Sequence, residues 1–148
     1  MHEELEGRVG EPFRITLETG KIREFARATK SSHAAFREEA PVIPTTFLQT
    51  AIFWQDAESS PWGNMVRNFS RILHGEQEFT FPDGPPKAGT SLTGQVRIDR
   101  VYEKQGKRGG TMTFIDVVTD YRDDEGRLVA QARNLTIETS VPASPGAS

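Results

Sequence analysis

The sequence predicts a single domain of the α+β class, in which one long antiparallel sheet packs on a buried helix. Two observations support this prediction. Helix-type apolar patterns fall before residue 60, whereas four long strand-type segments follow one another after residue 69. Separation of helices from strands along the chain is typical of α+β proteins. The length of 148 residues suits one domain with a core of its own.

A short strand and a helix come first in the expected order. Phe13, Ile15 and Leu17 alternate with polar residues, which is the period of a half-buried strand. Residues 21–29 are expected to form a helix, because apolar residues recur there at helical spacing. Residues 30–44 contain two prolines and predict an irregular segment, with a candidate helical turn over residues 34–39.

The most apolar helix is expected over residues 45–58. Its apolar residues cover more than one face, which is typical of a helix buried on most sides. Thr45 or Thr46 suits the N-cap position, directly after Pro44. This helix is the expected partner of the sheet.

Strands are expected near residues 70–81, 91–105, 111–122 and 128–139, in meander-like succession. The Asp-Asp-Glu-Gly sequence before the last strand predicts a hairpin. Within the second of these strands the apolar alternation changes phase, which predicts a bulge near Asp99 and Arg100. The domain is expected to cover residues 1–140, and residues 141–148, which lack an apolar pattern, are expected to be disordered.

Composition and charge exclude several classes of function. The chain has no cysteine, which excludes disulfides, zinc–thiolate sites and cysteine nucleophiles. A formal net charge of −3 argues against a dedicated nucleic-acid-binding protein. The three histidines show no metal-ligand spacing, so no metal site is expected. No long apolar segment and no signal peptide are evident, and we expect a soluble cytoplasmic protein without membrane contact.

Five short segments carry a resemblance to a known family: KIREFARA at 21–28, PTTF at 44–47, LHGEQEF at 73–79, KAGTSL at 87–92 and GGTMTF at 109–114. In this order and spacing they resemble the MaoC-like dehydratase family. The similarity is to its N-terminal-domain branch, which includes non-catalytic-type subunits of (3R)-hydroxyacyl dehydratases and R-specific enoyl hydratases. The resemblance spans about residues 6–140 and implies a single hot-dog fold, a curved antiparallel sheet of about five strands wrapped around a central helix.

The resemblance also implies a chemistry. Family members hydrate trans-2-enoyl thioesters carried on coenzyme A or acyl carrier protein, reversibly and without a cofactor. Active subunits use an Asp and a His, five positions apart after the first helix, as base and acid on one water. In this chain the two positions hold Ser31 and Phe36, and His33 stands where the family usually has Asn. We therefore expect that this chain alone lacks the usual dyad.

His74 and Glu76 are the candidate catalytic residues. Residues two apart share one face of a strand, so Glu76 is a candidate partner for a proton-donating His74. The alternative is that His74 is a hydrogen-bonded structural histidine at the sheet or at a dimer interface. His33 is a candidate substitute acid in the motif loop, against the alternative of a solvent-exposed loop histidine.

Two further groups are candidate binding residues. Thr45, Thr46 and Phe47 begin the expected central helix, where backbone amides face a thioester carbonyl in the resembling family. Ordinary threonine capping explains the same residues equally well. Lys104, Lys107 and Arg108 form a small basic cluster, which either contacts phosphates or an acidic carrier protein or is a solvated turn.

The leading hypothesis is a hot-dog subunit of an enoyl-thioester hydratase or 3-hydroxyacyl-thioester dehydratase. It would shape the acyl pocket while a second hot-dog chain supplies the Asp–His dyad, although a homodimer fits the same reasoning. The alternative is a non-enzymatic acyl-thioester binding or assembly module. A thioesterase is less favoured, because Asp56 and Glu58 lie at the far end of the central helix.

Overall fold

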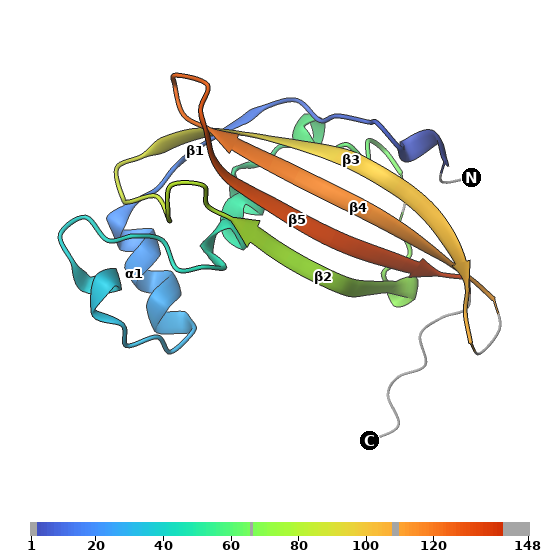
Figure 1. The fold of residues 1–148 in the computed structure, drawn as a ribbon, viewed down its shortest axis with the longest axis horizontal. Coiled ribbons are helices and arrows are strands. Elements are labelled where there is room, and N and C mark those ends of the chain that lie inside the picture. Colours follow the sequence, from blue (N-terminus) through green and yellow to red (C-terminus); the bar gives the residue numbers. More distant parts are fainter. Residues whose placement is uncertain (1–2, 66, 108–109, 141–148) are drawn as a thin grey trace.

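One antiparallel sheet of five strands runs the length of the molecule in the computed structural model, which describes residues 3–65, 67–107 and 110–140 (Figure 1). The strands lie in the order β1-β3-β4-β5-β2. Their bounds are β1 Phe13–Thr16, β2 Ile72–Thr80, β3 Ser91–Gln105, β4 Thr111–Arg122 and β5 Leu128–Thr139. All five predicted strands are therefore present, and the curved sheet with few helices is that of a hot-dog fold.

The strand order differs from the expected meander in the position of one strand. β3, β4 and β5 do follow one another, but β2 pairs with β5 at the edge of the sheet and β1 pairs with β3. β2 contains no fully buried residue, whereas β3 and β4 each bury several. The least buried of the long strands thus takes the edge, and the more apolar strands take the centre.

The predicted bulge and hairpin are both confirmed. The register between β3 and β4 shifts between Ile98 and Arg100, where the apolar alternation changes phase. In the turn between β4 and β5, the Asp123 carboxylate accepts hydrogen bonds from the backbone amides of Glu125 and Arg127. Gly126 supplies the positive φ of 80° that this turn needs.

The helices α1 and η3 lie on the inner face of the sheet, defined here as the face that carries Leu92 and Tyr121. The α-helix α1, Thr19–Ala28, buries Ile22 and Ala26 as its apolar spacing predicts. The 3₁₀ helix η3, Phe47–Trp54, buries Phe47, Leu48 and Ala51 against the sheet. The other 3₁₀ helices are η1 Glu3–Leu5, η2 Ala34–Arg37, η4 Ala57–Ser59 and η5 Phe69–Arg71.

The expected central α-helix over residues 45–58 is replaced by this shorter 3₁₀ helix. The segment is rich in β-branched and aromatic residues, which have low helix propensity. Ile52 and Phe53 are 66% and 83% exposed, so the element is buried on one side only. No long helix therefore covers the inner face of the sheet in the described part of the chain, and η3 leaves part of this face uncovered.

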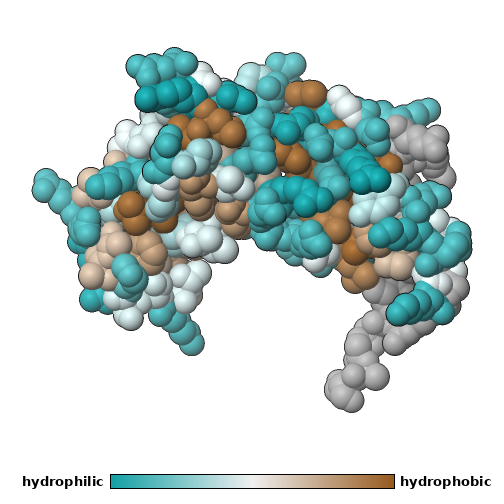
Figure 2. All heavy atoms as spheres, in the orientation of Figure 1, coloured by the Kyte–Doolittle hydropathy of each residue, from teal (hydrophilic) through white to brown (hydrophobic). Residues whose placement is uncertain are grey.

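The outer face of the sheet carries charged side chains rather than a covering layer. Asp116 on β4 is buried and accepts a hydrogen bond from Arg133 on β5 at 2.7 Å. Figure 2 shows polar side chains over much of the visible surface, with apolar patches between them. Among the described residues, no helix has the length and apolar character needed to span a membrane. The predicted disordered tail, residues 141–148, lies outside the described residues.

Candidate functional site

The loop after α1 holds no acid or base at the two positions of the expected dyad. The backbone amide of Ser31 donates to the carbonyl of Ala26 at 2.8 Å and so closes the end of α1. Phe36 lies on η2, and its ring is 5.6 Å from that of His33. His33 is the N-cap of η2, and its Nδ1 accepts a hydrogen bond from the Ala35 amide at 3.2 Å. The capping contact gives His33 a structural explanation.

The 3₁₀ geometry of η3 sorts its side chains into rows. Residues three apart lie above one another in such a helix, because it has three residues per turn. Phe47, Thr50 and Phe53 form one row toward α1. Gln49 and Ile52 form another row, which continues to the C-cap residue Gln55 and faces a second cavity over the inner face of the sheet. Two cavities of different chemistry thus lie on either side of η3.

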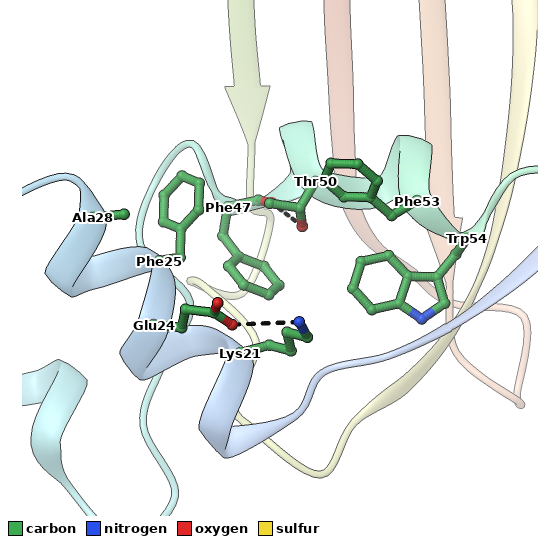
Figure 3. A pocket seen from close by; sticks show the side chains of 8 residues that line it. All are labelled: Lys21, Glu24, Phe25, Ala28, Phe47, Thr50, Phe53 and Trp54. Atoms are coloured by element: carbon green, nitrogen blue, oxygen red, sulfur yellow. Dashed lines mark hydrogen bonds and ion pairs between the residues drawn. The ribbon is translucent and has the colours of Figure 1, made fainter.

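The first cavity is large and mainly apolar. It has a volume of about 450 Å³ and lies between α1 and η3. Figure 3 shows aromatic rings from both elements turned toward this space, with the Lys21–Glu24 ion pair beside them. Phe25 and Phe47 pack edge to face, with ring centroids 5.5 Å apart. We call it the aromatic cavity; its lining residues are Lys21, Glu24, Phe25, Ala28, Phe47, Thr50, Phe53 and Trp54.

The second cavity, of about 160 Å³, has carboxamides in its wall. Gln77 Oε1 accepts hydrogen bonds from Gln49 Nε2 and from Asn134 Nδ2, the latter at 3.1 Å. Thr136 Oγ1 donates to Asn134 Oδ1 at 2.8 Å and extends the chain of contacts along β5. This amide cluster, Gln49, Gln77 and Asn134, connects η3 to the inner face of β2 and β5. Sequence reasoning missed it, because its members come from three distant segments.

The candidate pair His74 and Glu76 is separated by the structure. The pairing of β2 with β5 shifts register between these two residues, so an extra residue, Gly75, lies between them. His74 Nε2 therefore lies 3.4 Å from Gln77 Oε1, beside the amide cluster. Glu76 lies on the outer face, with its carboxylate 3.8 Å from Arg133 Nη1. The expectation that Glu76 partners His74 is wrong, because the bulge at Gly75 places His74 on the inner face and Glu76 on the outer face.

The candidate binding residues at the start of η3 divide into two kinds. Phe47 is buried and lines the aromatic cavity. Its amide donates to the carbonyl of Pro44 at 2.9 Å, and so it is used within the turn. Thr45 and Thr46 are exposed, and the Thr46 side chain makes no capping hydrogen bond to η3. Of the three residues, Phe47 lines the aromatic cavity, and Thr45 and Thr46 are not part of that lining.

Tyr121 is the most deeply buried titratable side chain on the inner face. It packs edge to face on Phe13, with ring centroids 6.2 Å apart. Burial raises the pKa of its hydroxyl above the ordinary value, so it stays neutral. In the described part of the chain, no group of three His, Asp or Glu residues is arranged to hold a metal ion.

The basic cluster lies far from both cavities, at the β3–β4 end of the sheet. Lys104 Nζ lies 5.2 Å from the ring centroid of Tyr102 and 5.0 Å from that of Phe114. Lys107 is exposed, and Arg108 lies outside the described residues. The contacts of Lys104 are those of a cation on an aromatic surface.

A family model and curated relatives each match most of this chain. The model of the FAS1-like dehydratase domain region matches residues 4–132. A UPF0336 protein of Streptomyces griseus is 31% identical over 121 residues, which are 76% of this chain and 77% of that protein. The UPF0336 protein Rv0504c of Mycobacterium tuberculosis is 30% identical over 118 residues, 74% of this chain and 68% of that protein.

Solved structures show the same fold. The C-terminally truncated HadBC (3R)-hydroxyacyl-ACP dehydratase complex of Mycobacterium tuberculosis contains a chain with a TM-score of 0.71 and 24% identity, matched over 90% of this chain and 96% of that chain. The ChsH1–ChsH2 complex of the same organism contains a chain with a TM-score of 0.68 and 14% identity, matched over 93% and 87%. Both of these neighbours are complexes of two kinds of chain.

Proposed function

Because the chain belongs to the family of the FAS1-like dehydratase domain region, and so to the MaoC-like hot-dog dehydratases, we propose that it is the pocket-forming subunit of an enoyl-thioester hydratase or 3-hydroxyacyl-thioester dehydratase. A second hot-dog chain would supply the Asp–His dyad. The proposal rests on two observations: an aromatic cavity of about 450 Å³ between α1 and η3, and a motif loop after α1 that has no acid or base at its two key positions.

The aromatic cavity suits the acyl chain of the substrate. Its wall is formed mainly by rings and by Ala28, and such surfaces gain free energy when they are covered by alkyl groups. The proposed chemistry would take place outside this wall. Addition of water to an enoyl thioester needs one base and one acid, and Ser31 and Phe36 supply neither.

A partner chain is supported by the edge of the sheet. β2 is an edge strand and pairs only with β5 among the described strands, so its other side can take a further strand. Large apolar side chains are exposed on β2, η5 and η3. Such patches are typical of protein–protein contacts. Their exposed fractions are 40% for Leu73, 80% for Phe69, 66% for Ile52 and 83% for Phe53. The heterocomplexes among the structural neighbours support a second hot-dog chain as the partner.

A non-enzymatic acyl-thioester binding or assembly module is the second candidate. The absent dyad favours it as much as it favours a partner-dependent subunit. Both candidates need the aromatic cavity to bind an acyl chain. They differ in whether a dyad-bearing chain joins this one and makes it active.

Acyl binding is tested by titration calorimetry with octanoyl- and decanoyl-pantetheine, which carry no phosphate. Ala28→Phe places a ring into the aromatic cavity from the exposed end of α1 and should weaken binding by about tenfold or more. Ala34→Phe adds the same ring on η2, away from this cavity, and should bind as the wild type does. Absence of binding by the wild type, or equal binding by Ala28→Phe, would overturn the proposed pocket.

A further inference from the structure

A third cavity lies on the other side of α1, between this helix and η2. It has a volume of about 330 Å³. Ser31 and Phe36, which occupy the positions of the expected dyad, are part of its wall. The remaining wall is unusual in its charge, because three of its side chains are arginines. We call it the arginine cavity; its lining residues are Arg23, Ala26, Arg27, Ser31, Phe36 and Arg37.

The three arginines are brought together by the local structure. Arg23 and Arg27 are four residues apart on α1 and so lie on one face, where two like charges destabilise a helix slightly. Arg37 comes from η2, and Arg23 Nη2 donates to the carbonyl of Glu38 at 3.0 Å. This contact fixes the segment that carries Arg37 against α1. The three arginines therefore lie close together although their positive charges repel one another.

These arginines also differ from several others in the described part of the chain. Arg97, Arg127 and Arg133 each have a carboxylate oxygen within 2.9 Å. Among the ion pairs of the described residues, none involves Arg23, Arg27 or Arg37. The Glu24 carboxylate, from the same helix, lies at the aromatic cavity with Lys21. The arginine cavity thus combines space with cationic groups that have no carboxylate partner in the described part of the chain.

Phosphate is the anion that this arrangement fits best. A guanidinium group presents parallel N–H donors that match two oxygens of a phosphate, and several such groups together bind it more tightly than a single charge does. The net charge of the chain is −3, so a local group of three cations stands out from its surroundings. The cavity therefore suits a phosphate ester, whose oxygens several guanidinium groups can bind at once.

The position of the arginine cavity relative to the aromatic cavity points to one kind of phosphate ester, the phosphorylated pantetheine arm of an acyl thioester. α1 separates the two cavities and contributes to both walls. An α-helix with its side chains is about 10–12 Å wide, so an extended molecule can reach from one side to the other. We propose that the arginine cavity binds the phosphate at the end of the pantetheine arm, while the acyl end of the same thioester occupies the aromatic cavity. This inference rests on the proposed function for the identity of the arm.

The alternative basic cluster is less suited to this role. Lys104 lies over the rings of Tyr102 and Phe114 on the outer part of the β3–β4 hairpin. That site is at the opposite end of the sheet from α1 (Figure 1). A phosphate bound there would hold the thioester far from the aromatic cavity.

The test uses ligands without an acyl chain, so that it does not depend on the aromatic cavity. Binding of phosphopantetheine and of pantetheine to the full chain is measured by titration calorimetry at low salt. We expect phosphopantetheine to bind about tenfold or more tightly than pantetheine. The double variant Arg27→Gln/Arg37→Gln should remove this advantage. The matched control Arg8→Gln/Lys87→Gln removes two positive charges from other exposed positions and should keep it.

Equal affinity for the two ligands, or an advantage that survives in the Arg27→Gln/Arg37→Gln variant, would overturn the inference. The two possible carriers of the pantetheine arm, coenzyme A and acyl carrier protein, are distinguished in the same experiment. Coenzyme A binding more tightly than phosphopantetheine would identify coenzyme A, whose additional phosphates then contribute. Equal binding of the two would show that the additional phosphates of coenzyme A do not contribute, as is expected for a site that takes the single phosphate of an acyl carrier protein. Failure of octanoyl-pantetheine to bind would count against the acyl pocket alone and leave this result standing.

Discussion

His74 Nε2 lies 3.4 Å from Gln77 Oε1, three residues further along the same strand. A regular strand would place these two side chains on opposite faces. The extra residue Gly75 brings them together and turns Glu76 to the outer face. A Cβ atom at Gly75 would lie 3.1 Å from the carbonyl oxygen of Leu135, so the close approach of the two strands favours glycine there. His74 thus belongs to the surroundings of the amide cluster.

The amide cluster is expected to stabilise the fold by a measurable amount. Gln77→Leu removes the acceptor shared by Gln49 and Asn134, and leaves their donors without this partner. We expect a loss of about 1 kcal/mol in the free energy of unfolding, measured by urea denaturation. Glu76→Gln, on the other face of the same strand, should change it by less than about 0.5 kcal/mol, because its ion pair is exposed. A larger effect at Glu76 than at Gln77 would contradict the assignment of faces.

The edge of β2 is expected to bind the partner chain. Leu73→Asp and Phe69→Asp place a charge on the exposed apolar patch and should weaken the complex by about tenfold or more, measured by calorimetry or by size-exclusion chromatography with light scattering. The isolated variants should unfold at the same urea concentration as the wild type. Val9→Asp is the control, since Val9 is 56% exposed and forms an isolated β-bridge with Arg97 of β3, away from the β2 edge. Loss of the complex in Val9→Asp alone would show that the partner binds near β1 and β3 and not at β2.

Gly94 is expected to tolerate no side chain. It lies opposite Phe13 in the β1–β3 pairing, and a Cβ atom would overlap the Phe13 ring. Gly94→Ala should therefore lower the free energy of unfolding by about 1–3 kcal/mol. Gly20→Ala, in the first turn of α1 with no neighbour within 4 Å, should leave stability unchanged or raise it by up to about 1 kcal/mol. Equal responses of the two variants would show that the Phe13 ring is not fixed against β3.

Asp123 in the β4–β5 turn should make the free energy of unfolding depend on pH in the acid range. Desolvation acts to raise the pKa of its carboxyl, but hydrogen bonds from the amide and side chain of Arg127 outweigh it and lower the pKa below the ordinary value. Asp123 therefore stabilises the fold above its unfolded pKa of about 3.9, and this contribution is lost as the pH falls through the lower folded value. The stability difference between wild type and Asp123→Asn should be constant near neutral pH and vanish in acid. A difference that stays constant down to the acid limit would contradict this account.

The strands of the sheet were largely predictable, because a half-buried strand records its burial as alternation. The bounds of β3, β4 and β5 follow from that pattern and from the breakers between them. The neighbour of β2 was not predictable, since alternation states which residues are buried but not which strand lies alongside. The bulge at Gly75 carried a signal, a glycine inside a strand, that marks such irregularities.

The site was less predictable than the fold. The loss of the dyad at Ser31 and Phe36 could be predicted from the motif alone. The 3₁₀ geometry of η3 could not, because its apolar composition also fits a buried α-helix, and the two rows of side chains depend on the three-residue turn. The arginine cavity had a partial signal in Arg23 and Arg27, four residues apart on a predicted helix. Arg37 joins them only through the packing of η2 on α1.

The most direct test of the central claim is hydration of crotonyl-coenzyme A by this chain alone and in complex with a hot-dog chain that carries the Asp–His dyad. We expect no activity above background for the chain alone and clear activity for the complex. His74→Ala should leave that activity essentially intact, because His74 contacts Gln77 and the proposed partner supplies the dyad. Hydration by the isolated chain that is lost in His74→Ala would contradict the account and place the chemistry on β2.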